Sequence, residues 1–262
     1  MDRDSEQDTK KARIGVLALQ GSFREHIAIL NKIEQVISSE VRTESELELV
    51  DGLVIPGGES TTMALVAEKW GLLPALRRFA SEGKPMWGTC AGLIFLADRA
   101  TGQKEGGQAL VGGLDCLVHR NFFGAQINSF ETMLECPNEL KIYNTESALE
   151  ADKFRAVFIR PPAITEVGPT VQVLATYSLS EEEQVMAPGT RAVVVAVRSG
   201  NLVATSFHPE LTADTRWHRY FSDIVKDNLA EPGYVRSTHG IATGKSKVHT
   251  KSTFRPADLP VY

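Results

Sequence analysis

The chain has 262 residues, of which 42% are hydrophobic and 23% charged, and its formal net charge is −5 at pH 7. This is the composition of a globular protein able to bury a sizeable core, and the acidic balance argues against a nucleic-acid partner. Three widely spaced cysteines without a Cys-x-x-Cys pair argue against a disulfide scaffold and a thiolate zinc site.

Residues 1–12 form a charged leader that lacks the apolar core of a secretory signal, and no apolar run is long enough to span a bilayer. We therefore expect a cytoplasmic protein without membrane contact. From residue 231 the chain is rich in Gly, Ser, Thr and Lys, which predicts a mobile tail over 231–262. Without internal repeats, residues 13–230 are expected to form one domain.

The first half of the chain shows one pattern three times: an apolar run, a glycine turn and an amphipathic segment. The apolar runs lie at 13–19, 52–55 and 85–89. Such runs suit strands buried on both faces, and the segments after them have helical spacing, the first with Ser22 as its expected N-cap. This order predicts a doubly wound sheet with helices on both faces.

The second half has a different pattern. Residues 109–134 alternate in polarity and are interrupted by glycine, which predicts short antiparallel strands at an edge of the sheet. A solvated loop is expected at 178–190 and a closing helix at 213–229. Further strands are expected at 154–164, 171–177, 191–198 and 201–207. The predicted fold is therefore α/β, with a doubly wound mixed sheet flanked by helices.

Cys90 stands in the stretch Gly-Thr-Cys-Ala-Gly (88–92), which has the spacing of a nucleophile elbow. A sharp strand-to-helix turn would hold the cysteine in strained backbone angles above the sheet, and small neighbours let the chain pass close by. The N-terminus of the following helix favours the thiolate. Cys116 and Cys136 lack such a setting and are expected to be core residues.

A thiol nucleophile needs a base, and the base needs a group that orients it. His208 ends the apolar run 201–207, at the edge where open α/β sheets carry their sites. Glu210 follows two residues later, and in extended geometry its carboxylate would project to the same side as the imidazole. His26 and His218 lie inside predicted helices and have weaker cases.

The stretch Pro-Gly-Gly-Glu-Ser (56–60) also follows a predicted strand. Gly57 and Gly58 would let the main chain approach a ligand, so that this loop and the N–H of Ala91 would form an oxyanion hole. The alternative is that the two glycines only make the turn, with Ser60 or Thr61 capping the next helix.

Together these stretches resemble the class I, or triad, glutamine amidotransferase family. Longer blocks are most similar to the glutaminase subunits of pyridoxal 5′-phosphate synthases, plant-type versions in particular: "IGVLALQGSFREH", "VHRNFFGAQINSFE", "VFIRPPAI" and "SFHPELTADTRWH". The resemblance covers residues 13–229 and implies a three-layer, flavodoxin-like sandwich.

The resemblance implies that Cys90 attacks the side-chain amide of L-glutamine, that His208 passes the thiol proton to departing ammonia, and that Glu210 orients His208. Water then hydrolyses the thioester to glutamate. The implied substrate contacts are Gly58, Glu59, Ser60, Arg120, Ile159 and Arg160. A guanidinium suits the carboxylate of a free amino acid, although a structural ion pair is the alternative for Arg120 and Arg160.

Members of this family pass ammonia through a tunnel to a partner synthase, a (β/α)₈-barrel protein, in a large hetero-oligomer. The resemblance implies the same partner for this chain, and neither a cofactor nor a metal. The sequence departs from the common family pattern at Ala125, where many relatives have arginine, and at Pro161, where many have alanine. Neither departure touches the expected triad.

Two other readings of the sequence stay open. One is a stand-alone cysteine hydrolase of the same fold, which would not be expected to carry the blocks "LQGSFREH" and "RNFFGAQ". The other is a regulatory subunit with a vestigial triad, which the presence of all three triad residue types disfavours.

Overall fold

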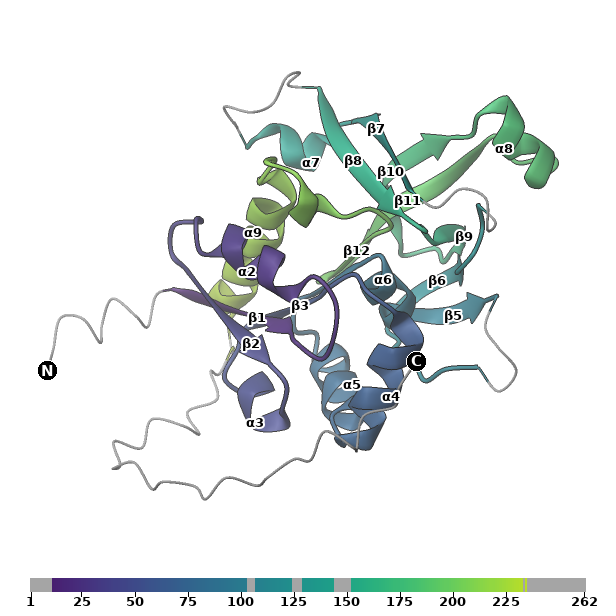
Figure 1. Cartoon of the computed structure of the whole chain (residues 1–262). Helices are drawn as coiled ribbons and strands as arrows, with labels where there is room; N and C mark the ends of the chain where they lie inside the picture. Colours follow the sequence, from purple (N-terminus) through teal and green to yellow (C-terminus); the bar gives the residue numbers. More distant parts are fainter. Residues whose placement is uncertain (1–10, 103–106, 124–128, 144–151, 233, 235–262) are drawn as a thin grey trace, which may run out of the picture.

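The computed structural model describes residues 11–102, 107–123, 129–143, 152–232 and 234 (Figure 1). Residues 1–10 of the expected leader, Ala125 and the expected tail from residue 235 lie outside these ranges. The domain boundaries therefore stay predictions.

Within the described residues, ten strands form one mixed sheet. They are β1 (Ala12–Leu17), β2 (Val36–Val41), β3 (Gly52–Ile55), β4 (Met86–Thr89), β5 (Ala97–Thr101), β6 (Leu114–His119), β9 (Ala163–Val167), β10 (Gln172–Ser178), β11 (Ala192–Ser199) and β12 (Leu202–Thr205). Their order is β2-β1-β3-β4-β12-β11-β9-β6-β5, with β10 beside β11. The strands β2, β1, β3, β4 and β12 run parallel, so their carboxyl ends share one edge.

Helices cover both faces of the sheet. They are α2 (Phe23–Leu30), α3 (Glu44–Leu47), α4 (Ser60–Lys69), α5 (Leu73–Ser81), α6 (Ala91–Leu96), α7 (Asn138–Lys141), α8 (Glu181–Met186) and α9 (Arg216–Ala230), with a 3-10 helix, η1, at Pro209–Leu211. Figure 1 shows α2 and α9 on one side of the sheet and α4, α5 and α6 on the other.

Two apolar clusters fill the spaces between these layers. Val54 packs with Trp87 and Phe221 beneath α2 and α9, whereas its neighbour Leu53 packs with Leu93 among α3 to α6. Because adjacent residues of β3 enter opposite clusters, the sheet is buried on both faces, as its apolar runs predict. The predicted three-layer α/β fold with a mixed sheet is confirmed.

The middle of the chain differs from expectation in two places. Among the described strands, β7 (Ser129–Glu135) pairs with β8 (Lys153–Ile159) alone, in a separate antiparallel sheet. The rings of Phe130 and Phe158 stack there at 4.7 Å between centroids, and Phe158 packs against Phe207 at 5.8 Å. Residues 178–190 hold a helix rather than a loop, since Ser180 and Glu183 form a capping box that starts α8.

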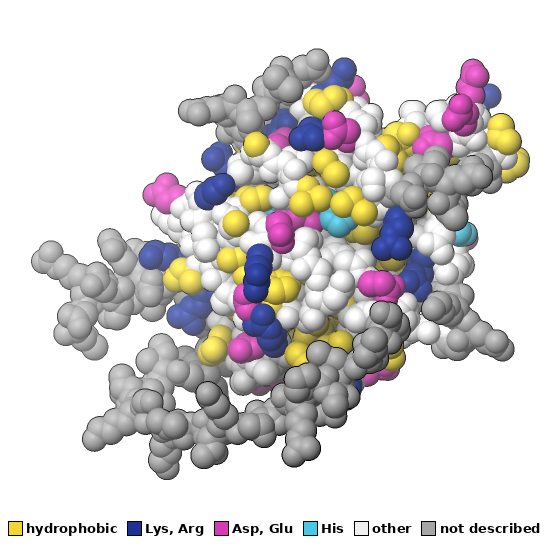
Figure 2. All heavy atoms as spheres, viewed as in Figure 1, with side chains coloured by type: hydrophobic (Ala, Val, Ile, Leu, Met, Phe, Trp, Pro, Cys, Tyr) yellow, Lys and Arg dark blue, Asp and Glu magenta, His cyan; other side chains and the backbone are white. Residues whose placement is uncertain are grey.

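No helix among the described residues is long and apolar enough to cross a bilayer. Figure 2 shows acidic and basic side chains interspersed over the face in view. All three cysteines are buried and free. Burial raises the pKa of Cys116 to about 12 and also raises that of Cys136, as expected for thiols of the core.

Candidate active site

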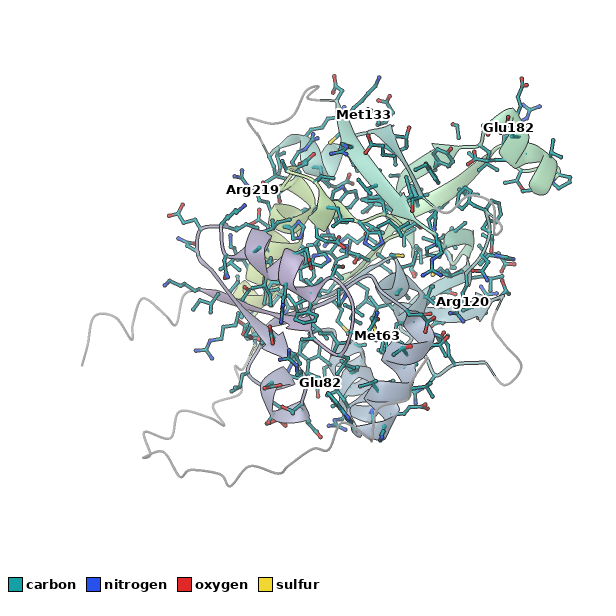
Figure 3. All side chains as sticks on the ribbon, in the orientation of Figure 1. Met63, Glu82, Arg120, Met133, Glu182 and Arg219 are labelled. Carbon is teal, nitrogen blue, oxygen red and sulfur yellow. The ribbon has the colours of Figure 1, made fainter. Side chains whose placement is uncertain are left out.

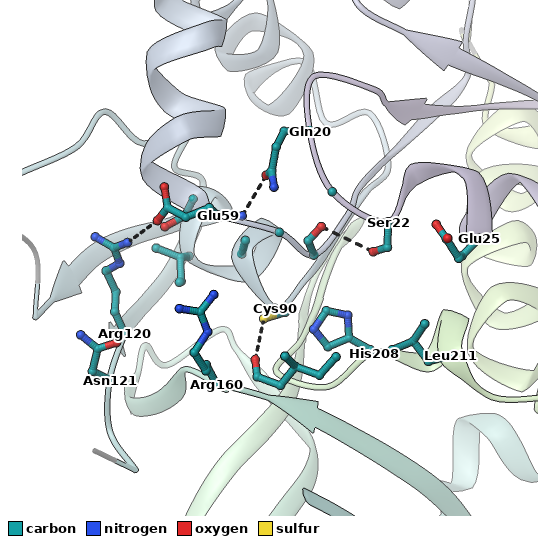
Figure 4. Close-up of a pocket in the computed structure, with 17 residues that line it drawn as sticks. Gln20, Ser22, Glu25, Glu59, Cys90, Arg120, Asn121, Arg160, His208 and Leu211 are labelled. Carbon is teal, nitrogen blue, oxygen red and sulfur yellow. Dashed lines mark hydrogen bonds and ion pairs between the residues drawn. The ribbon is translucent and has the colours of Figure 1, made fainter. Parts of the chain in front are cut away.

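A cavity of about 500 Å³ opens at the edge where the parallel strands end. It is lined by every residue that the sequence predicts for the site except Glu210, which lies buried behind His208. Figure 4 shows Cys90, Arg160 and His208 at its centre. The lining residues from the prediction are Gly57, Gly58, Glu59, Ser60, Cys90, Ala91, Arg120, Ile159, Arg160 and His208.

Cys90 occupies a strained turn between β4 and α6. Its φ of 50° and ψ of −102° lie in a region that non-glycine residues avoid. A hydrogen bond from its main-chain N–H to the carbonyl of Thr205, at 2.8 Å, ties this turn to β12. The Sγ atom lies 3.7 Å from the carbonyl oxygen of Ile159, and the residue is only 6% exposed. The fold therefore presents one thiol at the floor of the cavity.

The glycines on either side of Cys90 are sterically required. A Cβ on Gly88 would lie 2.4 Å from the carbonyl group of Gly92, and a Cβ on Gly92 would lie 2.0 Å from the carbonyl oxygen of Ile55. Both contacts are with main-chain atoms that cannot swing aside. The elbow thus packs directly on α6 and on β3, which explains the spacing of its glycines.

His208 follows β12 and immediately precedes η1 (Pro209–Leu211). The extended geometry expected for His208 to Glu210 is therefore wrong, yet the turn still brings Nδ1 of His208 to 2.7 Å from Oε1 of Glu210. Burial lowers the pKa of His208, but its interactions with Cys90 and Glu210 outweigh burial and raise this pKa to about 10. The imidazole lies beside Cys90 (Figure 4).

Glu210 is held as a buried carboxylate. Its Oε1 atom accepts hydrogen bonds from the Ser22 hydroxyl, at 2.6 Å, and from His208. Burial raises the pKa of Glu210, but the interactions with His26, His208 and Ser22 outweigh it and lower the pKa to about 2. An ionised carboxylate of this kind accepts from Nδ1 of His208, which leaves Nε2 to face the thiol.

The Gly57-Gly58 loop packs tightly around the site. A Cβ on Gly57 would lie 2.2 Å from Cε1 of His208, and one on Gly58 would lie 2.3 Å from Oε1 of Gln20. The same Gln20 oxygen accepts the N–H of Glu59 at 2.8 Å. Close approach of the main chain is thus a real requirement here.

The N-cap of α4 is neither Ser60 nor Thr61. It is Glu59, whose carboxylate accepts the N–H of Thr62 at 2.8 Å. Partial burial raises the pKa of Glu59, but hydrogen bonds from the N–H groups of Thr62 and Thr61 outweigh it and lower the pKa. Glu59 therefore adds an ionised carboxylate to the cavity wall.

The two predicted arginines differ in their surroundings. Arg120 lies beside β5 and β6 (Figure 3), and its Nη2 atom is 3.1 Å from both Oε1 of Glu59 and Oγ1 of Thr61. Arg120 is thus part of an ion pair, which is the alternative that the sequence analysis kept beside a role in substrate binding. Arg160 has a φ of 44° and makes no ion pair with a described residue. Its guanidinium points into the cavity (Figure 4).

Sequence reasoning missed several polar residues of the site. Ser22 was expected to cap α2, but its hydroxyl makes no such bond and instead donates to Glu210. Gln20 and Glu25 also line the cavity. The available signal was the Leu-Gln-Gly-Ser turn, which follows β1 at the same edge as the two glycine loops. Among the described residues, no group of His, Cys, Asp or Glu is placed to hold a metal ion.

Comparison with known proteins agrees with this geometry. The model of the SNO glutamine amidotransferase family matches residues 16–227. A relative from Arabidopsis thaliana, named "Probable pyridoxal 5′-phosphate synthase subunit", is 52% identical over an alignment of 263 positions that covers 95% of this chain and 99% of the relative. A pyridoxal 5′-phosphate synthase subunit from Dehalococcoides mccartyi is 46% identical over 215 residues, 82% of this chain and 98% of its own.

A crystal structure of a glutamine amidotransferase superposes with a TM-score of 0.64 at 40% sequence identity. The match covers 81% of this chain and 98% of that structure. The sequence comparison and the fold comparison thus both indicate a glutamine amidotransferase over most of the described residues. The chain belongs to the SNO glutamine amidotransferase family.

Proposed function

We propose that this chain is the glutaminase subunit of a pyridoxal 5′-phosphate synthase and hydrolyses L-glutamine to L-glutamate and ammonia. The observation that carries the proposal is one arrangement: Cys90 in a strained elbow beside an imidazole that a buried carboxylate holds at 2.7 Å. The relatives named as synthase subunits support the second half of the proposal.

The reaction proceeds in two halves. The proton of the Cys90 thiol passes to Nε2 of His208 before the attack, which leaves an imidazolium beside the sulfur, and the sulfur then attacks the amide carbon of the substrate. When the tetrahedral intermediate collapses, the C–N bond breaks and His208 returns the proton to the leaving nitrogen, which departs as ammonia. Water then attacks the glutamyl thioester while His208 takes its proton, and glutamate leaves as the thiol reforms. Glu210 stays ionised throughout and holds the tautomer of His208.

Main-chain N–H groups would stabilise the oxyanion. The N–H of Ala91 is the first of α6 and has no partner within the helix, so it is available to the oxygen that develops beside Cys90. The Gly57-Gly58 loop lines the other side of the cavity. We assign the oxyanion hole to these two elements.

The cavity wall suits a free amino acid. We assign the substrate carboxylate to Arg160, whose guanidinium points into the cavity and makes no ion pair with a described residue. Glu59, fixed by Arg120, is an ionised group that suits the substrate ammonium. The remaining predicted contacts, Gly58, Ser60 and Ile159, complete the same wall.

The partner proposed for this subunit is a (β/α)₈-barrel synthase. The two proteins would form a large hetero-oligomer in the cytoplasm, and the synthase would receive the ammonia before it is released to water. A glutaminase assay with and without that synthase tests the proposal. We expect slow production of glutamate by the isolated chain and much faster production in the complex. A rate that is the same with and without the synthase would favour the stand-alone hydrolase, and no glutamate in either case would favour a regulatory subunit.

A further inference from the structure

Two histidines that the proposed mechanism does not use are buried behind the site. His26 of α2 and His218 of α9 are both 0% exposed, and neither lines the cavity. Nδ1 of His26 lies 2.9 Å from Nε2 of His218, and both rings pack edge-on against Trp87. Polar groups in such apolar surroundings cost free energy unless they are hydrogen-bonded, so this pair calls for an explanation.

The contacts of His26 determine where its proton lies. Its Nε2 atom is 3.3 Å from Oε2 of Glu210 and 3.3 Å from Oγ1 of Thr89. A bare nitrogen lone pair 3.3 Å from an ionised carboxylate would be repelled by it, so Nε2 of His26 carries the hydrogen. Burial, the largest influence, lowers the pKa of His26 and keeps the ring neutral, which leaves Nδ1 without a hydrogen.

The proton on His218 follows from that on His26. Nδ1 of His26 can then only accept, so Nε2 of His218 carries the hydrogen that it receives. Burial also lowers the pKa of His218 well below its usual value, so its Nδ1 is bare, in keeping with the lack of a described hydrogen-bond partner at this atom. The N–H of His218 thus points to Nδ1 of His26, and the N–H of His26 points to the site of Thr89 and Glu210.

We propose that His26 and His218 are positioning residues of the glutaminase: Nε2 of His26 faces Oε2 of Glu210, His218 fixes the ring of His26, and Ser22 and His208 hold Oε1. Oε2 is buried without a hydrogen-bond partner among the described residues, and Nε2 of His26 lies beside it at 3.3 Å, so the carboxylate plane depends on this electrostatic contact with His26. That plane fixes the direction in which Glu210 accepts from Nδ1 of His208, and hence the aim of His208 at Cys90. This inference rests on the proposed function, because it assumes that Glu210 orients the base.

Two further charged groups act on His26: the imidazole of His208 lowers its pKa, and Glu25, which is exposed on α2, raises it. Glu210 is the buried carboxylate that His26 contacts, so a substitution of His26 tests how this contact orients Glu210. His218 reaches Glu210 only through His26, so its loss should have the smaller effect.

The kinetic test compares His26→Leu with His26→Gln, whose side-chain amide retains a donor near the position of Nε2. Active sites are counted with a chloroketone analogue of glutamine, and the synthase is present throughout. We expect His26→Leu to lower kcat per titrated site about 10-fold, the effect of losing one polar contact with the buried carboxylate, with KM within about twofold. His26→Gln should restore most of kcat.

Leu30→Ala is the matched control, because Leu30 is fully buried on the same helix and does not touch Glu210. It should lower the melting temperature yet leave kcat per titrated site unchanged. Wild-type kcat in His26→Leu, or a His26→Gln variant as slow as His26→Leu, would overturn the inference. An inactive wild-type enzyme would instead overturn the proposed function.

A second measurement does not depend on the catalytic activity of any variant. In the protein labelled with ¹⁵N-histidine, the ring nitrogens of His26 and His218 report their protons directly, and the signals are assigned by their loss in His26→Gln and His218→Gln. We expect a protonated Nε2 and a bare Nδ1 on both rings at about pH 8, because burial lowers the pKa of both histidines. A bare Nε2 on His26, or a doubly protonated ring, would overturn the inference.

Discussion

Glu210→Gln tests the electrostatics of the site most sharply. The substitution keeps the size of the side chain and removes its charge. In the wild-type protein the pKa of His208 is raised from 6.5 to about 10, partly through its 2.7 Å hydrogen bond with Glu210. A hydrogen bond between charged groups contributes about 1.5–3 kcal/mol, and one pKa unit corresponds to about 1.36 kcal/mol. The variant should therefore lower the pKa of His208 by about 1 to 2 units.

The assay is the pH dependence of kcat/KM for glutamine hydrolysis. A raised pKa means that the imidazolium persists as pH rises and is lost only as pH passes about 10, so the wild-type rate should fall on that alkaline limb. In Glu210→Gln the limb should move to lower pH by about 1 to 2 units, with kcat reduced about 10- to 100-fold. Glu25→Gln, which removes an exposed carboxylate from the same cavity, should leave the limb in place. An unmoved limb in Glu210→Gln would refute the assignment of Glu210 as the partner of His208.

Three further substitutions test separate parts of the site. Gly92→Ala places a Cβ 2.0 Å from the carbonyl oxygen of Ile55, so thermal melting should show a loss of about 3 kcal/mol or more, and a wild-type melting temperature would contradict this packing. Arg160→Ala should raise KM for glutamine about 10- to 100-fold with little change in kcat, and an unchanged KM in steady-state kinetics would exclude the carboxylate contact. Ser22→Ala removes one neutral donor to Glu210 and should lower kcat about 2- to 10-fold, whereas an effect as large as that of Glu210→Gln would mean that Ser22 does more than support the carboxylate.

The sequence predicts the parallel half of the sheet because local patterns determine it. The apolar runs of β1, β3 and β4 are buried on both faces, and each ends in a glycine turn at the edge that carries the site. The β7–β8 pair was not predicted as a separate sheet, because the stacking of Phe130 on Phe158 joins segments that are far apart in the chain. The Ser180 and Glu183 pattern of the α8 capping box is present in the sequence, but the segment has no apolar face that would indicate a helix.

The site shows the same division between local and distant signals. The position of Cys90 in a tight turn can be predicted from the sequence, because the two glycines that the turn requires, Gly88 and Gly92, lie within the same five residues. Glu210 reaches His208 through a 3-10 turn, so the predicted contact is present with a different backbone geometry. By contrast, Ser22 meets Glu210 across 188 positions of the chain, and no local pattern marks such a contact.

Arg120 and Arg160 illustrate a limit of residue type as a guide. Both are cations in stretches that resemble substrate-binding segments, and the sequence left an ion pair open for each. Only the arrangement in space separates them, since Arg120 is paired with Glu59 and Arg160 points into the cavity.

The central claim is that Cys90 is the nucleophile, and its most direct test is glutamate release by Cys90→Ala in complex with the synthase. Cys116→Ala is the matched control, because Cys116 is a buried thiol of β6 that does not line the cavity. We predict no detectable glutamate from Cys90→Ala, with the complex still formed, and normal turnover from Cys116→Ala. Undiminished glutamate release by Cys90→Ala would contradict the account.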